Sequence, residues 1–187
     1  MVNRSFTSSA LVTGFPSFWA AQQPSAVIVS DTETLALKPT SHDLVTHMMS
    51  LHWANDPVGQ LIQCRRALKP DGLFIAISFG GDTLQELRRA LGEAEISVTG
   101  GLSPRIAPLP ELRDLGGLLQ RAGFALPVAD TATLNVEYRD IWHLMRDLRA
   151  MGETNALSAR LRKPTRRAVF EKAQQLYAEH FSTSSGR

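Results

Sequence analysis

The stretch HDLVTHMMSLHWANDPVGQLIQCRRALKPDGLFIAIS (residues 42–78) decides the fold of this chain. Its beginning, residues 42–51, predicts a strand followed by a turn. A helix with Pro57 at its first position comes next, and the apolar run at 73–78 predicts another strand. A strand, a helix and a second strand in this order predict a crossover connection, which makes the two strands parallel.

The signals that begin and end the central helix are local. Asn55 or Asp56 can cap its first turn, because a short polar side chain there accepts a hydrogen bond from an amide without a helical partner. Val58, Leu61, Ile62 and Leu68 fall on one face of the helix. The sequence Lys-Pro-Asp-Gly at 69–72 stops it.

Predicted strands and helices also occur before residue 42 and after residue 78. AVIVS (26–30) is β-branched and apolar, as a buried parallel strand should be. Six further segments show helical or strand patterns after residue 83. Helices are predicted around 84–94, from Pro110 to a stop at Gly123, around 141–148 and at 166–181, and strand or hairpin material at 124–130 and 132–138. The alternation predicts an α/β fold with a mainly parallel sheet and helices on both of its faces.

Composition limits the class of protein. The chain has 187 residues, 43% of them apolar and 20% charged, which is typical of one soluble globular domain. No apolar run approaches the roughly 18 residues that span a bilayer, so no membrane span is expected. The lone cysteine, Cys64, excludes an internal disulfide and a Cys-rich zinc site. A cytoplasmic location follows as the first expectation.

The net charge is +2. Basic residues gather locally only between 160 and 167, and this cluster is interpreted as a solvated helix end and linker; it comprises Arg160, Arg162, Lys163, Arg166 and Arg167. A nucleic-acid site would need more basic residues with aromatic residues between them, so no nucleic-acid partner is expected.

The loops that follow the predicted strands are the places to look for a ligand, because α/β sheets bind ligands at the carboxyl ends of their strands. Asp31 could accept hydrogen bonds from a ligand or simply cap the loop. His52 could donate, accept or act as a base, or be an ordinary hydrogen-bonded loop histidine. Trp53 could stack on a ligand or pack against the next helix.

The third such loop is FGGDT (79–83). Gly80 and Gly81 allow close backbone approach, and Asp82 or Thr83 can cap the following helix. The cap alone would explain the motif. No catalytic triad, HExxH pair, P-loop or GxGxxG is present, so the residues by themselves leave the chemistry unassigned.

The order of motifs resembles a known family. SDTETLALKPTSHDLVTHMMSLHWANDP (30–57) followed by RRALKPDGLF (65–74) resembles the class I S-adenosylmethionine-dependent methyltransferases. Three later stretches are similar to the subgroup of the mitochondrial complex I assembly factor with a methyltransferase fold, a methyltransferase-like arginine hydroxylase; they are 79–95, 100–124 and 138–157. The biotin-synthesis malonyl-carrier-protein methyltransferase is a more distant relative. The resemblance implies a Rossmann-like fold over residues 26–181, with a divergent segment at 1–25 and a tail at 182–187.

The resemblance also implies roles for individual residues. Asp31, Thr32, Ser50 and Leu51 would bind the cofactor, S-adenosylmethionine. His52 would be the catalytic base if the methyl acceptor needs deprotonation, and no metal is expected. Trp53 and the loop after the last strand would form the substrate side of the cleft; the loop residues are Gly80, Gly81, Asp82 and Thr83.

Two departures from the family pattern shape the expected function. Gly14 is followed by Phe15 and Pro16, which cannot reproduce the family's glycine-rich cofactor loop. The family's final strand is also missing after SSGR. We therefore expect a methyltransferase-like protein with impaired cofactor binding and an incomplete sheet covered by a protein partner or a second copy. The alternatives are a non-catalytic assembly protein that retains the fold, and a location in the mitochondrial matrix.

Overall fold

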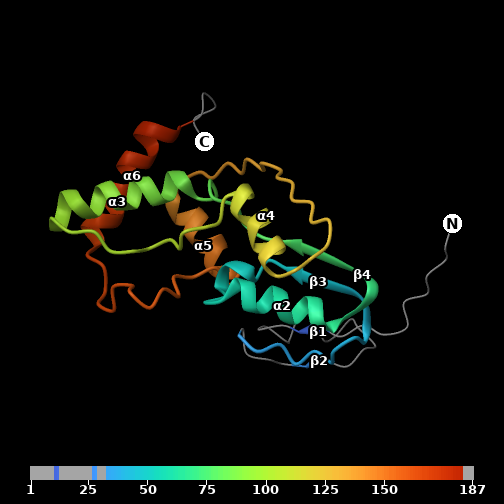
Figure 1. Cartoon of the computed structure of the whole chain (residues 1–187). Coiled ribbons are helices and arrows are strands. Elements are labelled where there is room, and N and C mark those ends of the chain that lie inside the picture. Colours follow the sequence, from blue (N-terminus) through green and yellow to red (C-terminus); the bar gives the residue numbers. More distant parts are fainter. Residues whose placement is uncertain (1–10, 13–26, 29–32, 183–187) are drawn as a thin grey trace. The chain divides into compact units, whose positions relative to one another are not determined.

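The computed structural model describes residues 11–12, 27–28 and 33–182. The chain divides into two compact units (Figure 1). The first comprises Met1–Gly81 and Pro110–Thr131, and the second comprises Asp82–Leu109 and Ala132–Arg187. Each unit has its own hydrophobic core.

The first unit is built on a parallel strand pair with a helical crossover. Strand β3 (His42–Met48) pairs with β4 (Leu68–Ile77), and helix α2 (Pro57–Ala67) connects them. The pairing is parallel and places Leu44 opposite Leu73 and Met48 opposite Ile77. The α/β class and the parallel pairing predicted from the sequence are confirmed, and the sheet is not closed.

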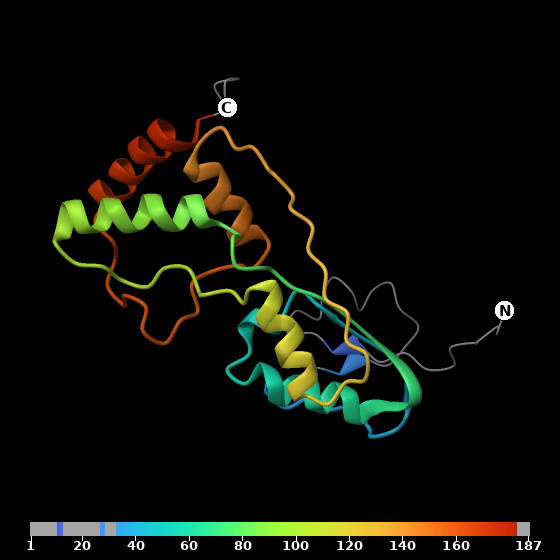
Figure 2. The ribbon, with the colours of Figure 1, turned by 45° about the horizontal axis from the view of Figure 1, so that its top comes forward.

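One face of this strand pair is packed. Val45 of β3 is buried with Cys64 and Ala67 of α2. Helix α4 (Leu112–Arg121) packs against α2 (Figure 2). Phe124, just after α4, stacks on Phe74 of β4 with ring centroids 4.7 Å apart. These contacts account for the apolar stripe on α2, whose Leu61 is almost fully buried.

The opposite face of the pair is apolar and exposed. Leu73, Ile75 and Ile77 of β4 alternate with the residues that point toward α2, and their exposed fractions are 55%, 41% and 54%. Met48 of β3, the partner of Ile77, is 47% exposed. Parallel sheets are normally buried on both faces, so this surface is unusual.

Local signals decide where the helices begin and end. Asp56 is the N-cap of α2, and its Oδ1 accepts a hydrogen bond of 2.9 Å from the amide of Gly59. Helix α4 ends just before Gly123, which lies in the left-handed region (φ 83°). The amides of Gly123 and Phe124 donate back to Gln120 and Leu119, which is a Schellman ending. The predicted cap and the predicted stop are both confirmed.

A second parallel pair precedes this unit's core. Strand β2 (Val27–Ile28), within the predicted strand at 26–30, pairs with β1 (Leu11–Val12). Strand β1 lies in the segment 1–25, for which the sequence indicated no strand.

The second unit is helical. Helix α3 (Gln85–Thr99) packs against α6 (Arg167–Phe181), and α5 (Ile141–Ala150) also contacts α6 (Figure 2). These three helices share one core; its buried members are Leu87, Leu91, Ala94, Ile141, Leu144, Val169 and Ala173. The predicted helices are therefore present.

Two sequence-based predictions are wrong. The segments 124–130 and 132–138 form no strand, and Leu126, Val128, Leu134 and Val136 are exposed. Their composition favours strands, but a strand needs a neighbour to satisfy its backbone, and none of the described strands pairs with them. Neither Asp82 nor Thr83 caps α3: the N-cap is Leu84 in the left-handed region (φ 60°), without a side-chain hydrogen bond.

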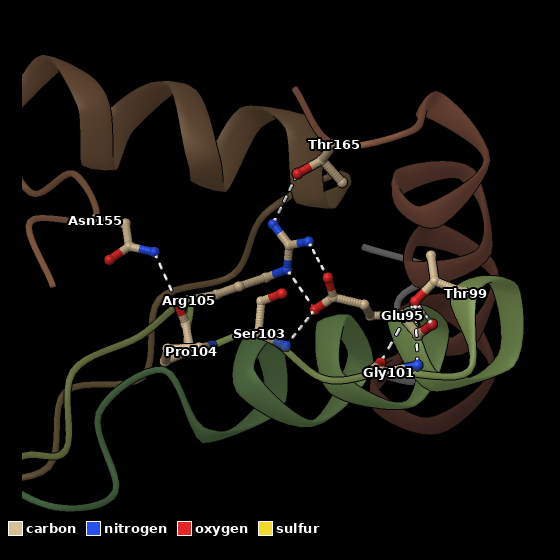
Figure 3. Close-up of polar contacts among 8 residues, drawn as sticks. All are labelled: Glu95, Thr99, Gly101, Ser103, Pro104, Arg105, Asn155 and Thr165. Atoms are coloured by element: carbon tan, nitrogen blue, oxygen red, sulfur yellow. Dashed lines mark hydrogen bonds and ion pairs between the residues drawn. The ribbon is translucent and has the colours of Figure 1, made fainter. Parts of the chain in front are cut away.

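A buried ion pair fixes the connection after α3. The carboxylate of Glu95 accepts hydrogen bonds from Arg105 Nη2 (2.7 Å), from Arg105 Nε (3.1 Å) and from the amide of Ser103 (3.0 Å) (Figure 3). The two side chains are 5% and 16% exposed. Arg105 Nη1 also donates to Thr165 Oγ1 (3.0 Å), which ties the segment before α6 to the same pair.

The environment of Glu95 makes this pair sensitive to pH. Burial raises the pKa of Glu95, but the hydrogen bonds from Arg105 and Ser103 outweigh it, and the net pKa lies below its ordinary value. A carboxyl group with a lowered pKa stabilises the folded state above its unfolded pKa. That contribution is lost as the pH falls through the folded pKa.

We expect Arg105→Ala to lower the free energy of unfolding of the second unit by about 3 kcal/mol at neutral pH, because it leaves the buried Glu95 carboxylate without its cation. Urea denaturation followed by circular dichroism measures this. The loss should shrink as the pH falls below the ordinary range of a glutamate and through the lowered pKa of Glu95, because the carboxylate then becomes protonated. Arg89→Ala removes the exposed pair with Glu93 on the same helix and is the matched control, with almost no expected change. Equal effects of both variants at every pH would contradict the account.

Candidate functional site

The predicted site residues after β3 form a tight turn. Met49 has a positive φ of 51°, and its amide donates to the carbonyl of Ile77 (2.7 Å), which keeps the two strand ends together. One turn of 3₁₀ helix, η1 (Leu51–Trp53), follows. A left-handed conformation in a bulky residue costs on the order of 1 kcal/mol or more, so the surrounding contacts must hold this turn in place.

The side chains of this turn face different surroundings. Ser50 is exposed. Leu51 is 5% exposed and packs with Leu61 and Ala122 in the core, so a ligand could reach only its main chain. The ring of His52 lies 5.5 Å from that of Trp53 and 5.2 Å from that of Phe79, which follows β4. His52, Trp53 and Phe79 thus form one aromatic group at the carboxyl ends of β3 and β4.

A carboxylate that the sequence did not single out for this purpose joins two of the predicted loops. Glu33 Oε1 accepts hydrogen bonds from the amide and from Nδ2 of Asn55, both at 2.9 Å, and Oε2 accepts one from the amide of Asp56 (3.3 Å). The loop after β2 is thereby tied to the loop after β3. The two loops are adjacent, as the carboxyl ends of strands in one α/β site should be.

Helix α2 strengthens this tie. The side-chain amide of Gln63 donates to the carbonyl of Glu33 and accepts from the amide of Leu35, both at 2.8 Å. Gln63 therefore pairs with the backbone of 33–35 as a neighbouring strand would. The sequence pattern offered no signal for this contact, because Gln63 lies 28 residues from Leu35 and on the polar side of its helix.

A buried polar pair was also missed. His47 of β3 is 8% exposed, and its Nε2 lies 2.9 Å from Gln60 Oε1 on α2. Because that oxygen can only accept, Nε2 donates to it, and Nδ1 lies 3.5 Å from Ser50 Oγ. His47 thus contacts Ser50 from the core side of the turn.

Burial raises the pKa of the Cys64 thiol to about 11, which keeps the thiol protonated and unreactive at neutral pH.

The remaining predicted residues are placed differently. Asp31 and Thr32 lie outside the described residues, as does Gly14. Gly80 has open space where a Cβ would lie, whereas a Cβ on Gly81 would collide with the carboxylate of Glu111. Gly81 belongs to the first unit and Asp82 to the second, so the predicted substrate wall at 80–83 crosses the boundary between them.

The part of the chain that the structure describes contains neither a cluster of metal-binding side chains nor a membrane-spanning helix. No group of three or more His, Cys, Asp and Glu side chains there is arranged to hold a metal ion. None of the helices in that part combines the length and apolar character needed to cross a bilayer.

The comparisons with known proteins give the class first. Residues 15–76 match the family model described as "Methyltransferase domain". This segment spans β2, β3, α2 and most of β4, so the match falls on the strands and loops described above. The resemblance predicted from the sequence is confirmed.

Named proteins from several organisms are similar in sequence to this chain. The chain is 47% identical over 132 residues to the human protein named Arginine-hydroxylase NDUFAF5, mitochondrial; the match covers 71% of this chain and 38% of the relative. It is 42% identical over 163 residues to the rat protein of the same name, covering 87% and 47%. Malonyl-[acyl-carrier protein] O-methyltransferase of Methylovorus sp. is 35% identical over 150 residues, covering 80% and 49%. The chain spans half or less of the length of these relatives.

Two solved structures resemble the chain loosely. A putative methyltransferase from Bacillus halodurans has a TM-score of 0.42 at 15% identity, covering 58% of this chain and 46% of that one. A complex of the Haloferax volcanii Trm112 methyltransferase activator with a putative methyltransferase gives 0.45 at 16% identity, covering 84% and 61%.

We expect Glu33→Gln to speed amide hydrogen exchange at Asn55 and Asp56 by about tenfold, because hydrogen bonds to a charged acceptor are worth about 1.5–3 kcal/mol and the neutral amide replaces them poorly. Exchange measured residue by residue by NMR tests this. Asp56→Ala is the matched control: it removes the cap of α2 and should speed exchange at Gly59 instead. Unchanged exchange at Asn55 in Glu33→Gln would show that the tie is not what holds the loop.

Proposed function

We propose that the first unit binds S-adenosylmethionine at the carboxyl ends of β2 and β3, and that the protein is a methyltransferase-like protein with reduced affinity for this cofactor. The observation that carries the proposal is the Glu33 tie, which holds the two loops of the predicted cofactor edge against each other. The match of residues 15–76 to a methyltransferase domain supports it. Phe15 and Pro16 in place of a glycine-rich loop support the reduced affinity.

The described residues fit such a ligand in part. Ser50 offers an exposed hydroxyl at the loop, and Leu51 offers its main chain, while its side chain anchors the turn in the core. By the roles that the resemblance implies, Asp31 would accept from the adenine amine and Thr32 would lie beside it. The bound cofactor would supply a methyl group activated by a sulfonium centre.

The aromatic group of His52, Trp53 and Phe79 would serve the reacting end. Its rings would exclude water from the transfer and orient the acceptor, and orientation with desolvation is the main contribution a protein makes to a direct displacement. His52 would take a proton from the acceptor where the acceptor must lose one. The loop from Gly80 to Thr83 would contact the substrate.

We expect S-adenosylhomocysteine to bind the full chain in the micromolar range or weaker, and Asp31→Ala to weaken binding by about tenfold or more, because one charge-assisted hydrogen bond is lost. Isothermal titration calorimetry measures both. His52→Gln should leave the affinity within about twofold, since a base contributes to the transfer and not to binding. Asp130→Ala, an exposed loop aspartate elsewhere in the first unit, is the control. No heat at millimolar ligand with a folded protein would overturn the proposal.

A second candidate function is a non-catalytic assembly protein that retains the fold, as the resemblance to a complex I assembly factor implies. The observation that favours it is the exposed apolar face of β3 and β4, which a protein partner or a second copy would cover. The NDUFAF5 relatives carry "arginine-hydroxylase" in their names, so hydroxylation of an arginine on such a partner is a separate, enzymatic alternative; inserting the oxygen atom would consume molecular oxygen and two electrons from an external reductant. Intact-mass analysis of a co-purified partner would show it as one added oxygen atom. Their names also favour a mitochondrial location over the cytoplasmic one.

If this face docks a partner or a second copy, Ile75→Lys should abolish the association without unfolding the protein, because a charged side chain in a desolvated apolar interface is strongly unfavourable. Analytical ultracentrifugation measures self-association, and co-purification measures a partner. Leu126→Lys is the control, since Leu126 is an apolar residue outside the sheet that is even more exposed than Ile75. A monomer with no partner, unaffected by either substitution, would remove this candidate.

A further inference from the structure

The second unit carries a concentration of positive charge that the proposed function does not use. Residues 139–172 contain nine Lys and Arg against four Asp and Glu, a net charge of +5, while the whole chain carries only +2. The sequence alone favoured a solvated helix end for the part between 160 and 167. The structure places one of these residues, Arg167, at an aromatic surface, with Arg166 next to it in the chain.

The aromatic surface is a shallow depression on α5 and α6. Trp142, Thr165, Arg167 and Phe170 line it, and its volume is about 490 Å³. Trp142 is 45% exposed, and its ring centroid lies 5.6 Å from that of Phe170. The guanidinium of Arg105, which is held by Glu95 and Thr165 (Figure 3), lies 6.0 Å from the centre of the Phe170 ring.

Three further arginine side chains lie on the same helix as Trp142 or next to lining residues of the depression. Arg146 and Arg149 follow Trp142 on α5 at spacings of four and seven residues, which puts all three on the exposed side of that helix. Arg166 adjoins the lining residues Thr165 and Arg167. Among the described residues, Arg146, Arg149 and Arg166 make no ion pair, so their charges are available to a partner. Arg167 is paired with Glu171 only at the surface.

The beginning of α6 adds to this field. Its N-cap is Arg166, no side chain caps it, and its first turn contains no acidic residue. A helix N-terminus favours negative charge, so two arginines there are an electrostatic mismatch. A carboxylate from outside the chain would offset it, and the basic charges would attract such a group over about 10 Å at moderate salt.

We propose that the surface formed by Trp142, Thr165, Arg167 and Phe170, with Arg146, Arg149 and Arg166 near it, docks an acidic protein segment that lays one apolar side chain against the Trp142–Phe170 pair. Tryptophan and arginine are the residues that dominate protein interfaces energetically. A nucleic acid fits less well, because it stacks successive bases on several aromatic side chains along a groove, and this depression holds a single aromatic pair. The proposal is independent of cofactor binding in the first unit.

Fluorescence anisotropy with a dye-labelled short peptide tests this on the full chain. The peptide carries one phenylalanine flanked on both sides by aspartates and glutamates. We expect micromolar binding that weakens as salt rises, and a loss of at least about tenfold in affinity for Trp142→Ser and for Arg146→Glu with Arg166→Glu. Trp142→Phe should restore most of the affinity. Arg113→Glu, the same substitution made once at an exposed position of α4, is the control and should change the affinity by less than about twofold.

Three outcomes would overturn the proposal. One is the absence of binding up to millimolar protein. Another is equal binding of a peptide with serine in place of the phenylalanine, which would show that charge acts without the aromatic pair. The third is tighter binding of an oligothymidylate or of anionic lipid vesicles that ignores Trp142→Ser. Circular dichroism of each variant shows whether the fold is intact, and Trp142→Phe keeps the test valid if Trp142→Ser is unstable.

Discussion

The parallel pairing of β3 with β4 is the constraint on which the first unit depends. Two parallel neighbours cannot be joined by a tight turn, so the chain must cross over through α2, and the crossover packs Cys64 and Ala67 onto Val45. The same pairing brings the end of β3 beside the end of β4. Met49 donates to Ile77 there, and His52 and Phe79 meet as a result. The candidate site is thus a direct consequence of strand direction.

Hydrogen bonds from outside the sheet then set the shape of that edge. Glu33 and Gln63 hold the segment after β2 against the loop after β3, and His47 with Gln60 supports Ser50 from the core side. These contacts use side chains in place of a ladder, which suits a unit whose described strands form two separate pairs. These contacts at the edge are the reason for proposing that a cofactor binds there.

The sequence predicted what depends on local chemistry. Pro57 and Asp56 located the start of α2, and Gly123 located the end of α4, because caps and stops need only a few neighbouring residues. Contacts between distant residues were out of reach: Glu33 with Asn55 and Glu95 with Arg105 are set by the fold and by no sequence spacing. The strands expected at 124–138 failed for the same reason. Their residues favour extended structure, but the pairing partner that a strand requires is not specified locally.

The central claim is that a cofactor binds at the edge shared by the loops after β2 and β3. Titration of ¹⁵N-labelled full chain with S-adenosylhomocysteine, followed by amide chemical shifts, tests it most directly. The account predicts saturable shifts at 31–33 and 50–53 with little change at 139–172 in the second unit. Shifts confined to the second unit, or none at saturating ligand with a well-dispersed spectrum, would contradict it.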